Sequence, residues 1–505
     1  MFKRILIANR GEIALRIIRS AREMGMQSVA VYSEFDSNAL HTRIADIAVP
    51  LGGRLPSESY LSIDKILKAA KDTGAEAIHP GYGFLAENAE FAKRVVDAGL
   101  AWIGPPAESI IAMGDKIESR RLMSAAKVPV VPGLTDPVAD FEAALKAAED
   151  IGYPIAIKAS AGGGGKGIRI VQKAEDMEAA FRAASGEAIT AFGDGRLYLE
   201  RYLDRPRHIE IQVLFDSEGN GVSLYERECS VQRRHQKLLE ECPSIVVDEA
   251  LRAEMGEVAL RAGRAVGYVG AGTVEFLFSG GKFFFLEMNT RLQVEHPVTE
   301  MVTGIDIVRE QLRIAAGEPL GYSQAEVPRN GWSIEVRINA EDPATGFLPS
   351  TGKIGNLRLP GGPWVRVDSG MFRGMEVGLN YDPMLAKLVV WAPNREMAIA
   401  RMIRALQELH VGGVRTGAPA ALSVLQDERF ISGDFDTSIL STMDFGVTNE
   451  EDERLAAVAA AIHRRQMAKR SALGESAGRR EGWLKRSRNS VSRHSSSPIF
   501  EGEGA

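Results

Sequence analysis

Short apolar runs and amphipathic stretches alternate over about the first 112 residues of the chain. Residues 5–8 have the character of a buried strand, and apolar side chains recur at helical spacing through residues 11–25. Further strand-like runs lie at 28–32, 75–79 and 101–103. This alternation predicts a mostly parallel sheet with helices on its faces, and in such sheets ligands collect at the carboxyl ends of the strands.

The pattern changes from about residue 113, where strand-like runs become more numerous. Two of them, 273–278 and 283–288, surround Gly280-Gly281 and give a strong hairpin signal. The mixed pattern continues to about residue 443. The other elements predicted in this part of the chain are strands at 155–158, 168–171, 197–200 and 209–215 and helices at 251–267, 305–316 and 395–408.

The last part of the chain, after Thr448, has a different composition. An Ala-rich stretch over 450–468 predicts a helix, and residues 464–493 carry ten Lys or Arg against two Glu. Ser and Arg dominate residues 485–497, which is typical of a segment without a packed core. We expect a mobile basic tail, and the sequence leaves open whether it is merely solvated or contacts an acidic partner.

The overall composition is that of a globular protein, with 45% apolar and 25% charged residues over 505 positions. This length corresponds to about three or four domains. The net charge of −6 disfavours a general nucleic-acid binder, which needs positive charge on its binding face. The two cysteines fit neither a zinc site nor a disulfide framework, which indicates a reducing compartment. Because the sequence shows no presequence and no apolar run of about 20 residues, we expect a cytoplasmic protein.

Lys158 precedes a glycine-rich segment, Gly162–Gly167, between two of the predicted strands. A loop with few Cβ atoms lets backbone N–H groups approach phosphate oxygens closely, and a lysine beside it adds positive charge. The segment is not a Walker A motif, because Gly167 stands where Ser or Thr would follow Lys166. By itself the segment is equally typical of a flexible hairpin without a ligand.

The predicted hairpin carries one acidic residue on each strand, Glu275 and Glu287, with Asn289 two residues beyond the second. A three-residue loop would place the two glutamates opposite each other on one face, whereas a two-residue loop would place them on opposite faces. The glycine pair permits the bulged, three-residue form. Two carboxylates and an amide oxygen would suit Mg²⁺, which prefers a few protein oxygens together with substrate phosphates. The alternative, one buried and one solvated glutamate on an ordinary strand, remains open.

The segment after the hairpin, Asn289–Pro297, adds an arginine and a candidate base. Arg291 can bind a planar oxyanion through two parallel hydrogen bonds, and Glu295 is close to it along the chain. With Lys237 from another segment, these residues can hold a small anion beside a metal-bound phosphate. An isolated Arg–Glu pair is usually structural, but this pair directly follows a metal-type hairpin.

Taken together, these residues resemble the biotin carboxylase component of biotin-dependent carboxylases, a family within the ATP-grasp fold. The similarity spans essentially residues 1–445 and rests on long segments that are far more specific together than any single glycine motif. These segments are Ala8–Ala14, His79–Asn88, the glycine-rich segment, Glu226–Lys237 and Phe285–Glu300.

The resemblance implies a combined α/β and α+β fold. Residues 1–112 would form a Rossmann-like N-terminal domain, and residues 113–330 a central ATP-grasp domain with a glycine-rich lid at about 131–203. Residues 331–445 would form the C-terminal biotin carboxylase domain, followed by the basic tail, 446–505.

The resemblance also implies an ATP-dependent ligase, in which MgATP, bicarbonate and protein-linked biotin give ADP, phosphate and carboxybiotin through carboxyphosphate. The implied catalytic residues are Lys237, Arg291, Glu295 and Arg337. The implied bicarbonate cradle is Lys237, Arg291, Gln293, Val294 and Glu295, and the implied biotin end of the site is Tyr82 and Arg337. The implied ligands of Mg²⁺ or Mn²⁺, with two ions expected, are Glu275, Glu287 and Asn289. The implied ATP contacts are Lys116, Lys158, Gly164, Gly165, Glu200, Arg201, Tyr202, Leu203, His208, Gln232, His235, Glu275 and Glu287.

The sequence contains no Ala-Met-Lys-Met biotinylation motif and no carboxyltransferase region. We therefore expect a free-standing subunit that works with a carboxyltransferase subunit. Its biotin would arrive on a separate carrier protein or subunit. The family usually dimerises, and Arg16, Arg19 and Glu23 are interface candidates that are equally typical of solvated charges. The sequence does not identify the final acceptor, an acyl-CoA or pyruvate. The alternative function is that of another ATP-grasp carboxylate–amine ligase.

Overall fold

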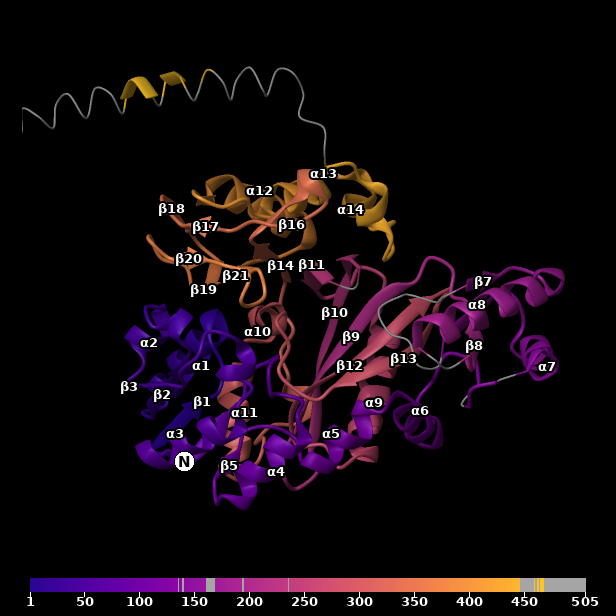
Figure 1. Cartoon of the computed structure of the whole chain (residues 1–505), viewed down its shortest axis with the longest axis horizontal. Coiled ribbons are helices and arrows are strands. Elements are labelled where there is room, and N and C mark those ends of the chain that lie inside the picture. The colour runs from indigo at the N-terminus through magenta and orange to yellow at the C-terminus, as the bar shows by residue number, and fades with distance from the viewer. Residues whose placement is uncertain are drawn as a thin grey trace, which may run out of the picture. The chain divides into compact units, whose positions relative to one another are not determined.

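The alternating pattern at the N-terminus forms a five-stranded parallel sheet (Figure 1). Its strands are β1 (Arg4–Ile7), β2 (Gln27–Tyr32), β3 (Ile47–Pro50), β4 (Ala77–His79) and β5 (Ala101–Trp102), and its helices are α1 (Gly11–Glu23), α2 (Leu40–Ile44), α3 (Ile63–Thr73), α4 (Ala89–Asp97) and α5 (Ala107–Gly114). Ile5 and Ile7 pack into one core cluster with Ile13 and Ile17 of α1, whereas Leu6 packs into a second cluster with α3 and α4. The strand order β3-β2-β1-β4-β5 is that of a doubly wound sheet, which confirms the predicted Rossmann-like fold.

The computed structural model describes residues 1–134, 136–138, 140–159, 169–192, 195–234 and 236–445, with Val458, Ala461, Ile462 and 464–466 near the C-terminus. Contacts divide the chain into two units, Met1–Phe445 and Gly446–Ala505. Three residues predicted for the site, Gly164, Gly165 and His235, lie outside the described residues. The few described residues of the second unit are helical and fall within the range 450–468 predicted as a helix.

A small antiparallel sheet with two helices follows the N-terminal region. Its strands are β6 (Ile155–Ala159), β7 (Arg169–Val171) and β8 (Leu197–Arg201), and its helices are α7 (Phe141–Ile151) and α8 (Met177–Phe192). Ala144, Ile155, Ile157 and Leu199 form part of its own buried core cluster. This subdomain is joined to the N-terminal region through α6 (Lys116–Ala125).

The largest sheet has eight antiparallel strands and runs from the middle of the chain into its C-terminal part. Its strands are β9 (Arg207–Phe215), β10 (Gly221–Arg233), β11 (Gln236–Cys242), β12 (Gly270–Ser279), β13 (Lys282–Asn289), β14 (Trp332–Asn339), β19 (Val365–Ser369) and β21 (Met384–Ala392). The order is β13-β12-β9-β10-β11-β14-β21-β19, so β11 pairs with β14 across a long stretch of sequence. The helices that follow its strands are α9 (Glu249–Ala265), α10 (His296–Thr303) and α11 (Ile307–Ala315).

The C-terminal part of the first unit adds helices and short ribbons to this sheet (Figure 1). Its helices are α12 (Arg395–Glu408), α13 (Ala418–Gln426) and α14 (Glu428–Ser432), and its two-stranded ribbons are β15 (Glu341–Asp342) with β16 (Leu348–Pro349), β17 (Gly352–Lys353) with β20 (Glu376–Val377) and β18 (Leu357–Arg358) with β22 (His410–Val411). Helix α12 has the bounds that the sequence predicted, because Ala398, Met402 and Ala405 line one fully buried face. Among the described residues, no helix combines the length and apolar character that crossing a membrane requires.

Helix α1 carries the three charged residues that were predicted as interface candidates. Arg16, a predicted interface candidate, is buried and forms ion pairs with Glu300 and Asp306 of the same chain, at 2.8 and 2.7 Å. Arg19 and Glu23 are exposed on the same helix. The alternative that Arg16 is a solvated charge is therefore wrong, because its guanidinium holds α1 against α10 and the start of α11.

Candidate active site

The β12–β13 hairpin makes Glu275 and Glu287 direct cross-strand partners. Its loop contains only the two glycines, so the predicted three-residue loop is wrong. The register instead shifts just beyond the pair Phe276–Phe285, which leaves Leu286 as one extra residue in a β-bulge. The bulge returns Glu287 to a position opposite Glu275, so the predicted pairing is confirmed although its cause is different.

The two carboxyl groups of this acid pair differ in their ionisation. Glu275 is buried, whereas Glu287 is exposed. Desolvation by the surrounding protein raises the pKa of Glu287, and the nearby charge of Glu275 raises it further. Burial would also raise the pKa of Glu275, but Lys237 and His208 lower it well below its ordinary range. Facing carboxylates repel each other, and a divalent cation relieves that repulsion while taking their oxygens as ligands. The acid pair therefore fits the predicted Mg²⁺ or Mn²⁺ site.

Asn289 connects the acid pair to the anion-binding residues. Its Nδ2 donates a hydrogen bond to Glu275 Oε1 at 2.9 Å, and its Oδ1 accepts one from Arg291 Nη2 at 2.8 Å. The amide oxygen is thus engaged by Arg291, and a role for Asn289 as a metal ligand stays a prediction.

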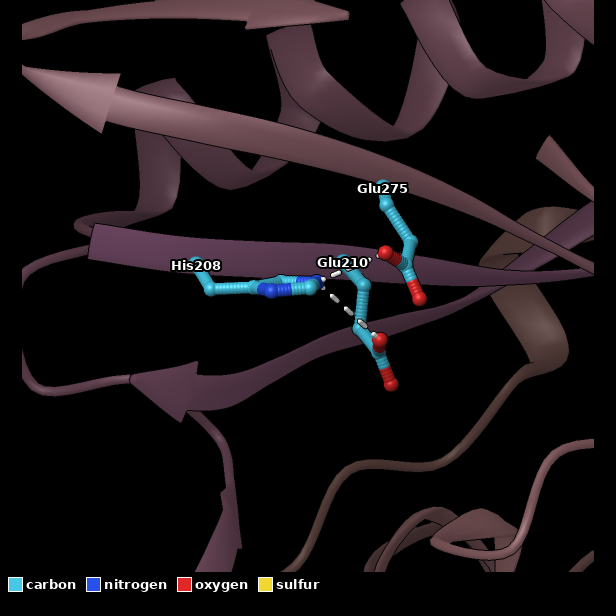
Figure 2. Close-up of side chains that lie close together, drawn as sticks. All are labelled: His208, Glu210 and Glu275. Carbon is cyan, nitrogen blue, oxygen red and sulfur yellow. Dashed lines mark ion pairs between the residues drawn. The ribbon is translucent and has the colours of Figure 1, made fainter. Parts of the chain in front are cut away.

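Glu210 is a third acidic residue beside the pair, and the sequence analysis missed it. It is the cross-strand partner of Glu275, and His208 precedes it by two residues on β9. His208 Nε2 lies 3.0 Å from Glu275 Oε2 and 3.7 Å from Glu210 Oε2 (Figure 2). Burial would lower the pKa of His208, but the charge of Glu275 raises it above its ordinary value. The two glutamates therefore favour the protonated form of the histidine, and its predicted contact with the nucleotide stays a prediction.

Lys237 is surrounded by three carboxylates. Its Nζ donates hydrogen bonds to Glu295 Oε1 at 2.5 Å, to Glu210 Oε2 at 2.7 Å and to Glu275 Oε1 at 3.1 Å. Burial would lower the pKa of Lys237, but these carboxylates raise it well above its ordinary value. The side chain is therefore a fixed positive charge between the acid pair and Glu295.

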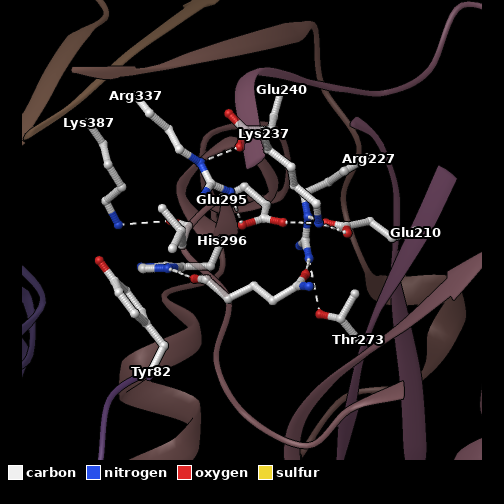
Figure 3. Close-up of polar contacts among 12 residues, drawn as sticks. Tyr82, Glu210, Arg227, Lys237, Glu240, Thr273, Glu295, His296, Arg337 and Lys387 are labelled. Carbon is white, nitrogen blue, oxygen red and sulfur yellow. Dashed lines mark hydrogen bonds and ion pairs between the residues drawn. The ribbon is translucent and has the colours of Figure 1, made fainter. Parts of the chain in front are cut away.

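Glu295 lies between Lys237 and Arg337 (Figure 3). Arg337 donates from Nη2 to Glu295 Oε2 at 2.9 Å and from Nε to Glu240 Oε1 at 2.6 Å. Burial would raise the pKa of Glu295, but Lys237, Arg337 and Arg227 lower it well below its ordinary range. The predicted base is therefore ionised and in direct contact with two of the predicted catalytic residues.

Arg227, which the sequence analysis also missed, links the remaining parts of this network. Its guanidinium is fully buried and donates to Glu210 at 2.5 Å and to Gln293 Oε1 at 2.7 Å. Gln293 in turn donates from Nε2 to Glu275 Oε1 at 2.7 Å. One hydrogen-bonded network thus contains Lys237, Gln293 and Glu295 of the predicted cradle, and Arg291 joins it through Asn289.

A cavity of about 450 Å³ adjoins the two side chains that contact Glu295. Tyr82, Lys237, Val294 and Arg337 are among the residues that line it, so the structure brings both predicted biotin residues to the same space as the cradle. Lys387 Nζ, fully buried, donates to the Val294 carbonyl at 2.9 Å and fixes this part of the wall (Figure 3). Tyr82 donates from its hydroxyl to Glu12.

The residues predicted to contact ATP lie on several elements. Lys158 on β6 pairs with Glu200 on β8, and Glu200 also accepts from Arg120 at 3.4 Å. Lys116 begins α6, and its charge lowers the pKa of Glu287 against the effect of burial. The other described members of the predicted set are Arg201 at the end of β8, Tyr202 and Leu203 just after it, and Gln232 on β10, opposite Lys237.

Three family models match successive parts of the chain. They describe the N-terminal domain of biotin carboxylase (residues 1–110), the ATP binding domain of the carbamoyl-phosphate synthase L chain (115–323) and the biotin carboxylase C-terminal domain (335–442). The chain belongs to the biotin carboxylase family.

Known proteins agree with this assignment. The chain is 51% identical to a pyruvate carboxylase subunit of Methanothermobacter thermautotrophicus, over 89% of this chain and 92% of that protein. It is 50% identical to biotin carboxylase 1 of Bacillus subtilis, over 88% of this chain and 99% of that protein. A solved structure, the biotin carboxylase domain dimer of Hydrogenobacter thermophilus 2-oxoglutarate carboxylase with MgADP, ADP and bicarbonate, is 49% identical and has a TM-score of 0.80. It matches 87% of this chain and 97% of that chain.

Membership of this family confirms the predicted fold class, with Rossmann-like, ATP-grasp and C-terminal biotin carboxylase domains. It also confirms that the chain is an ATP-dependent ligase of the biotin carboxylase type.

Proposed function

We propose that this chain carboxylates biotin on a separate carrier protein or subunit, using ATP and bicarbonate, as the first half-reaction of an acyl-CoA or pyruvate carboxylase. The observation that best supports this proposal is the position of Glu295, in contact with both Lys237 and Arg337. Lys237 also contacts Glu275 of the acid pair, which suits a metal-bound phosphate, and Arg337 lines the cavity beside Tyr82. The three substrates would therefore meet at one carboxylate.

In the proposed first step, Arg291 and Lys237 hold bicarbonate while Glu295 accepts its proton. Bicarbonate is a poor nucleophile until it is deprotonated, and a positioned base typically contributes about 10²–10⁴-fold in rate. The low pKa of Glu295 makes it a weak base as long as Lys237 and Arg337 both contact it. An anion bound to Lys237 would weaken that contact and so make Glu295 a stronger base.

The deprotonated anion would then attack the γ-phosphoryl group of ATP. Phosphoryl transfer depends on positioning and on neutralising charge, which Lys116 and Lys158 would provide along the phosphates. Mg²⁺ or Mn²⁺ held by Glu275 and Glu287, with Asn289, would supply further positive charge on the phosphate oxygens. The carboxyphosphate formed is labile to water, so a lid at about residues 131–203 would protect it.

Carboxyphosphate would decompose to CO₂ and phosphate, and the phosphate would take the proton from N1′ of biotin. Arg337, which lines the cavity together with Tyr82, would stabilise the enolate-like oxygen of biotin. Loss of a preorganised donor of this kind typically costs roughly 3–4 kcal/mol in the transition state. Glu240 would hold Arg337 through Nε and leave its Nη2 free to turn from Glu295 to biotin.

The chain would work with a biotinylated carrier and a carboxyltransferase subunit, as a homodimer in the cytoplasm. The related solved structure is described as a dimer, and Arg19 and Glu23 are exposed on α1 in this chain. Relatives of about equal identity act in pyruvate and in 2-oxoglutarate carboxylases, so the site described here does not select the acceptor.

The test is to measure ADP release and carboxybiotin formation by the purified chain with MgATP, bicarbonate and free biotin. We expect ADP release that requires bicarbonate and carboxybiotin that requires both substrates. ADP release that needs an amine acceptor and ignores biotin would instead indicate a carboxylate–amine ligase.

A further inference from the structure

Glu87 reaches from the N-terminal domain to the exit of the β12–β13 hairpin. It lies in the loop between β4 and α4. Its Oε2 accepts a hydrogen bond from Arg291 Nε at 2.8 Å, and its Oε1 accepts one from the Thr290 N–H at 3.2 Å. One carboxylate thus contacts both the side chain that the proposed mechanism assigns to bicarbonate and the backbone next to it.

The loop that carries Glu87 is itself held in place. Leu85 and Ala86, just before it, are buried, and the Ala86 N–H donates to the Gly83 carbonyl at 2.9 Å. Asn88, just after it, caps α4 by accepting from the Phe91 N–H at 2.8 Å. Because the backbone is fixed on both sides, the carboxylate of Glu87 meets Arg291 without ordering a flexible segment.

The hydrogen bonds of Arg291 can be counted donor by donor. A guanidinium carries five N–H groups, one on Nε and two on each terminal nitrogen. Nε donates to Glu87, Nη2 donates to Asn289 Oδ1 at 2.8 Å, and Nη1 donates to the Leu292 carbonyl at 3.2 Å. Within the described part of the chain, one N–H on each terminal nitrogen is left without an acceptor. These two groups remain available to an anion, and a guanidinium typically binds a planar oxyanion through two parallel hydrogen bonds.

We propose that Glu87 is a positioning residue for bicarbonate, which fixes Arg291 through Nε so that the Nη1–Nη2 fork faces the anion. This inference rests on the proposed function of Arg291 in the cradle. Glu87 would not touch the anion and would act only through the orientation of the guanidinium.

The negative charge of Glu87 opposes this effect, since a carboxylate near the cradle repels bicarbonate. Its side chain is 42% exposed, however, so solvent screens that repulsion. Arg291 is much less exposed, at 20%. Without Glu87 its guanidinium would keep the hydrogen bonds to Asn289 and to the Leu292 carbonyl but lose the one that fixes Nε, so its plane would tilt more easily away from the anion. We therefore expect orientation to outweigh repulsion.

The experiment compares Glu87→Ala, Glu87→Gln and wild type in steady-state ADP release, with bicarbonate and ATP varied separately. Glu90→Gln, an exposed glutamate in the first turn of α4, is the matched control. We expect Glu87→Ala to raise the KM for bicarbonate about tenfold or more, the loss typical of one charge-assisted hydrogen bond, with the KM for ATP within about twofold. Glu87→Gln should recover part of this loss, because its amide oxygen still accepts from Nε.

Three outcomes would overturn the inference. The first is a KM for bicarbonate that stays within about twofold of wild type in Glu87→Ala. The second is a lower KM in Glu87→Gln, which would show that repulsion dominates. The third is an equal change in both KM values and in melting temperature, which would show a structural role. If wild type itself releases no ADP in response to bicarbonate, the proposed function fails and this inference fails with it, whereas a normal wild type with an unaffected Glu87→Ala refutes only the inference.

Discussion

Glu240 and Glu335 face each other as direct cross-strand partners on β11 and β14, and both side chains are completely buried. Glu240 accepts from Arg337, and neither oxygen of Glu335 has a hydrogen-bond partner within the described residues. Burial and the charge of Glu240 raise the pKa of Glu335 well above its ordinary value, which favours a shared proton on the pair.

This pair predicts a pH dependence of stability. Burial raises the pKa of Glu240 from 4.5 to about 7, although Arg337 opposes the shift. The folded state therefore binds more protons than the unfolded state between these two values. The contribution of Glu240 to the free energy of unfolding is fully present below pH 4.5 and is lost as the pH rises through about 7. This effect is on the order of 3 kcal/mol at most.

In the variant Glu240→Gln, the side chain at position 240 cannot ionise. We therefore expect this variant to lose less stability than wild type when the pH is raised from 5.5 to 8, two values that bracket the raised pKa of about 7. The midpoint of urea unfolding at each pH measures this. Glu396→Gln, at an exposed position on α12, is the control. Parallel pH profiles for wild type and Glu240→Gln would refute the shift.

Glu295→Gln should abolish most of the bicarbonate-dependent ADP release, by about 10²–10⁴-fold, because an amide cannot accept the proton of bicarbonate. Nucleotide binding should persist, since Lys237 separates Glu295 from the acid pair. ADP release and nucleotide affinity measured on the same preparation would check both. Unchanged turnover would remove Glu295 from its proposed role as the base.

Arg337→Ala should separate the two partial reactions. Arg337 lines the cavity beside Tyr82, whereas the proposed mechanism places phosphoryl transfer at the hairpin, so we expect bicarbonate-dependent ADP release to survive better than carboxybiotin formation. We expect carboxybiotin formation to fall by about 10²–10³-fold more than ADP release does. An equal loss of both activities would contradict this assignment.

Glu287→Gln should raise the Mg²⁺ concentration needed for half-maximal activity about tenfold, since the proposed metal site would have one charged ligand replaced by a neutral one. A titration of free Mg²⁺ at saturating ATP gives this value. Ser279→Ala, at the tip of the same hairpin, controls for damage to the strands. If both variants respond to Mg²⁺ as wild type does, the acid pair does not bind the ion.

Local patterns in the sequence predicted several elements well, although α7, α8, β10 and β11 were not predicted. The helix over 395–408 has the bounds expected, because its buried face repeats at helical spacing and Asn394 caps its first turn. The joining of β11 to β14 was not predicted, because nothing local in either strand specifies a partner about ninety residues away along the chain.

The candidate site was predictable where its residues cluster in sequence, as from Asn289 to Glu295. Glu210 and Arg227 were missed, although β9 shows polar residues at every second position, with His208, Glu210 and Gln212 inside an apolar strand. Glu87 was recognised only as part of a motif, because its contact with Arg291 spans 204 positions along the chain.

The bulge at Leu286 makes the number of residues in β13, more than the identity of residue 286, the condition for pairing Glu275 with Glu287. Its side chain is 42% exposed, so many amino acids would be tolerated there. Deleting that single position would reverse the orientation of every residue behind it and send Glu287 to the opposite surface of the strand. Loops commonly tolerate insertions and deletions. This hairpin would instead tolerate substitutions at position 286, but not the insertion or deletion of one residue there.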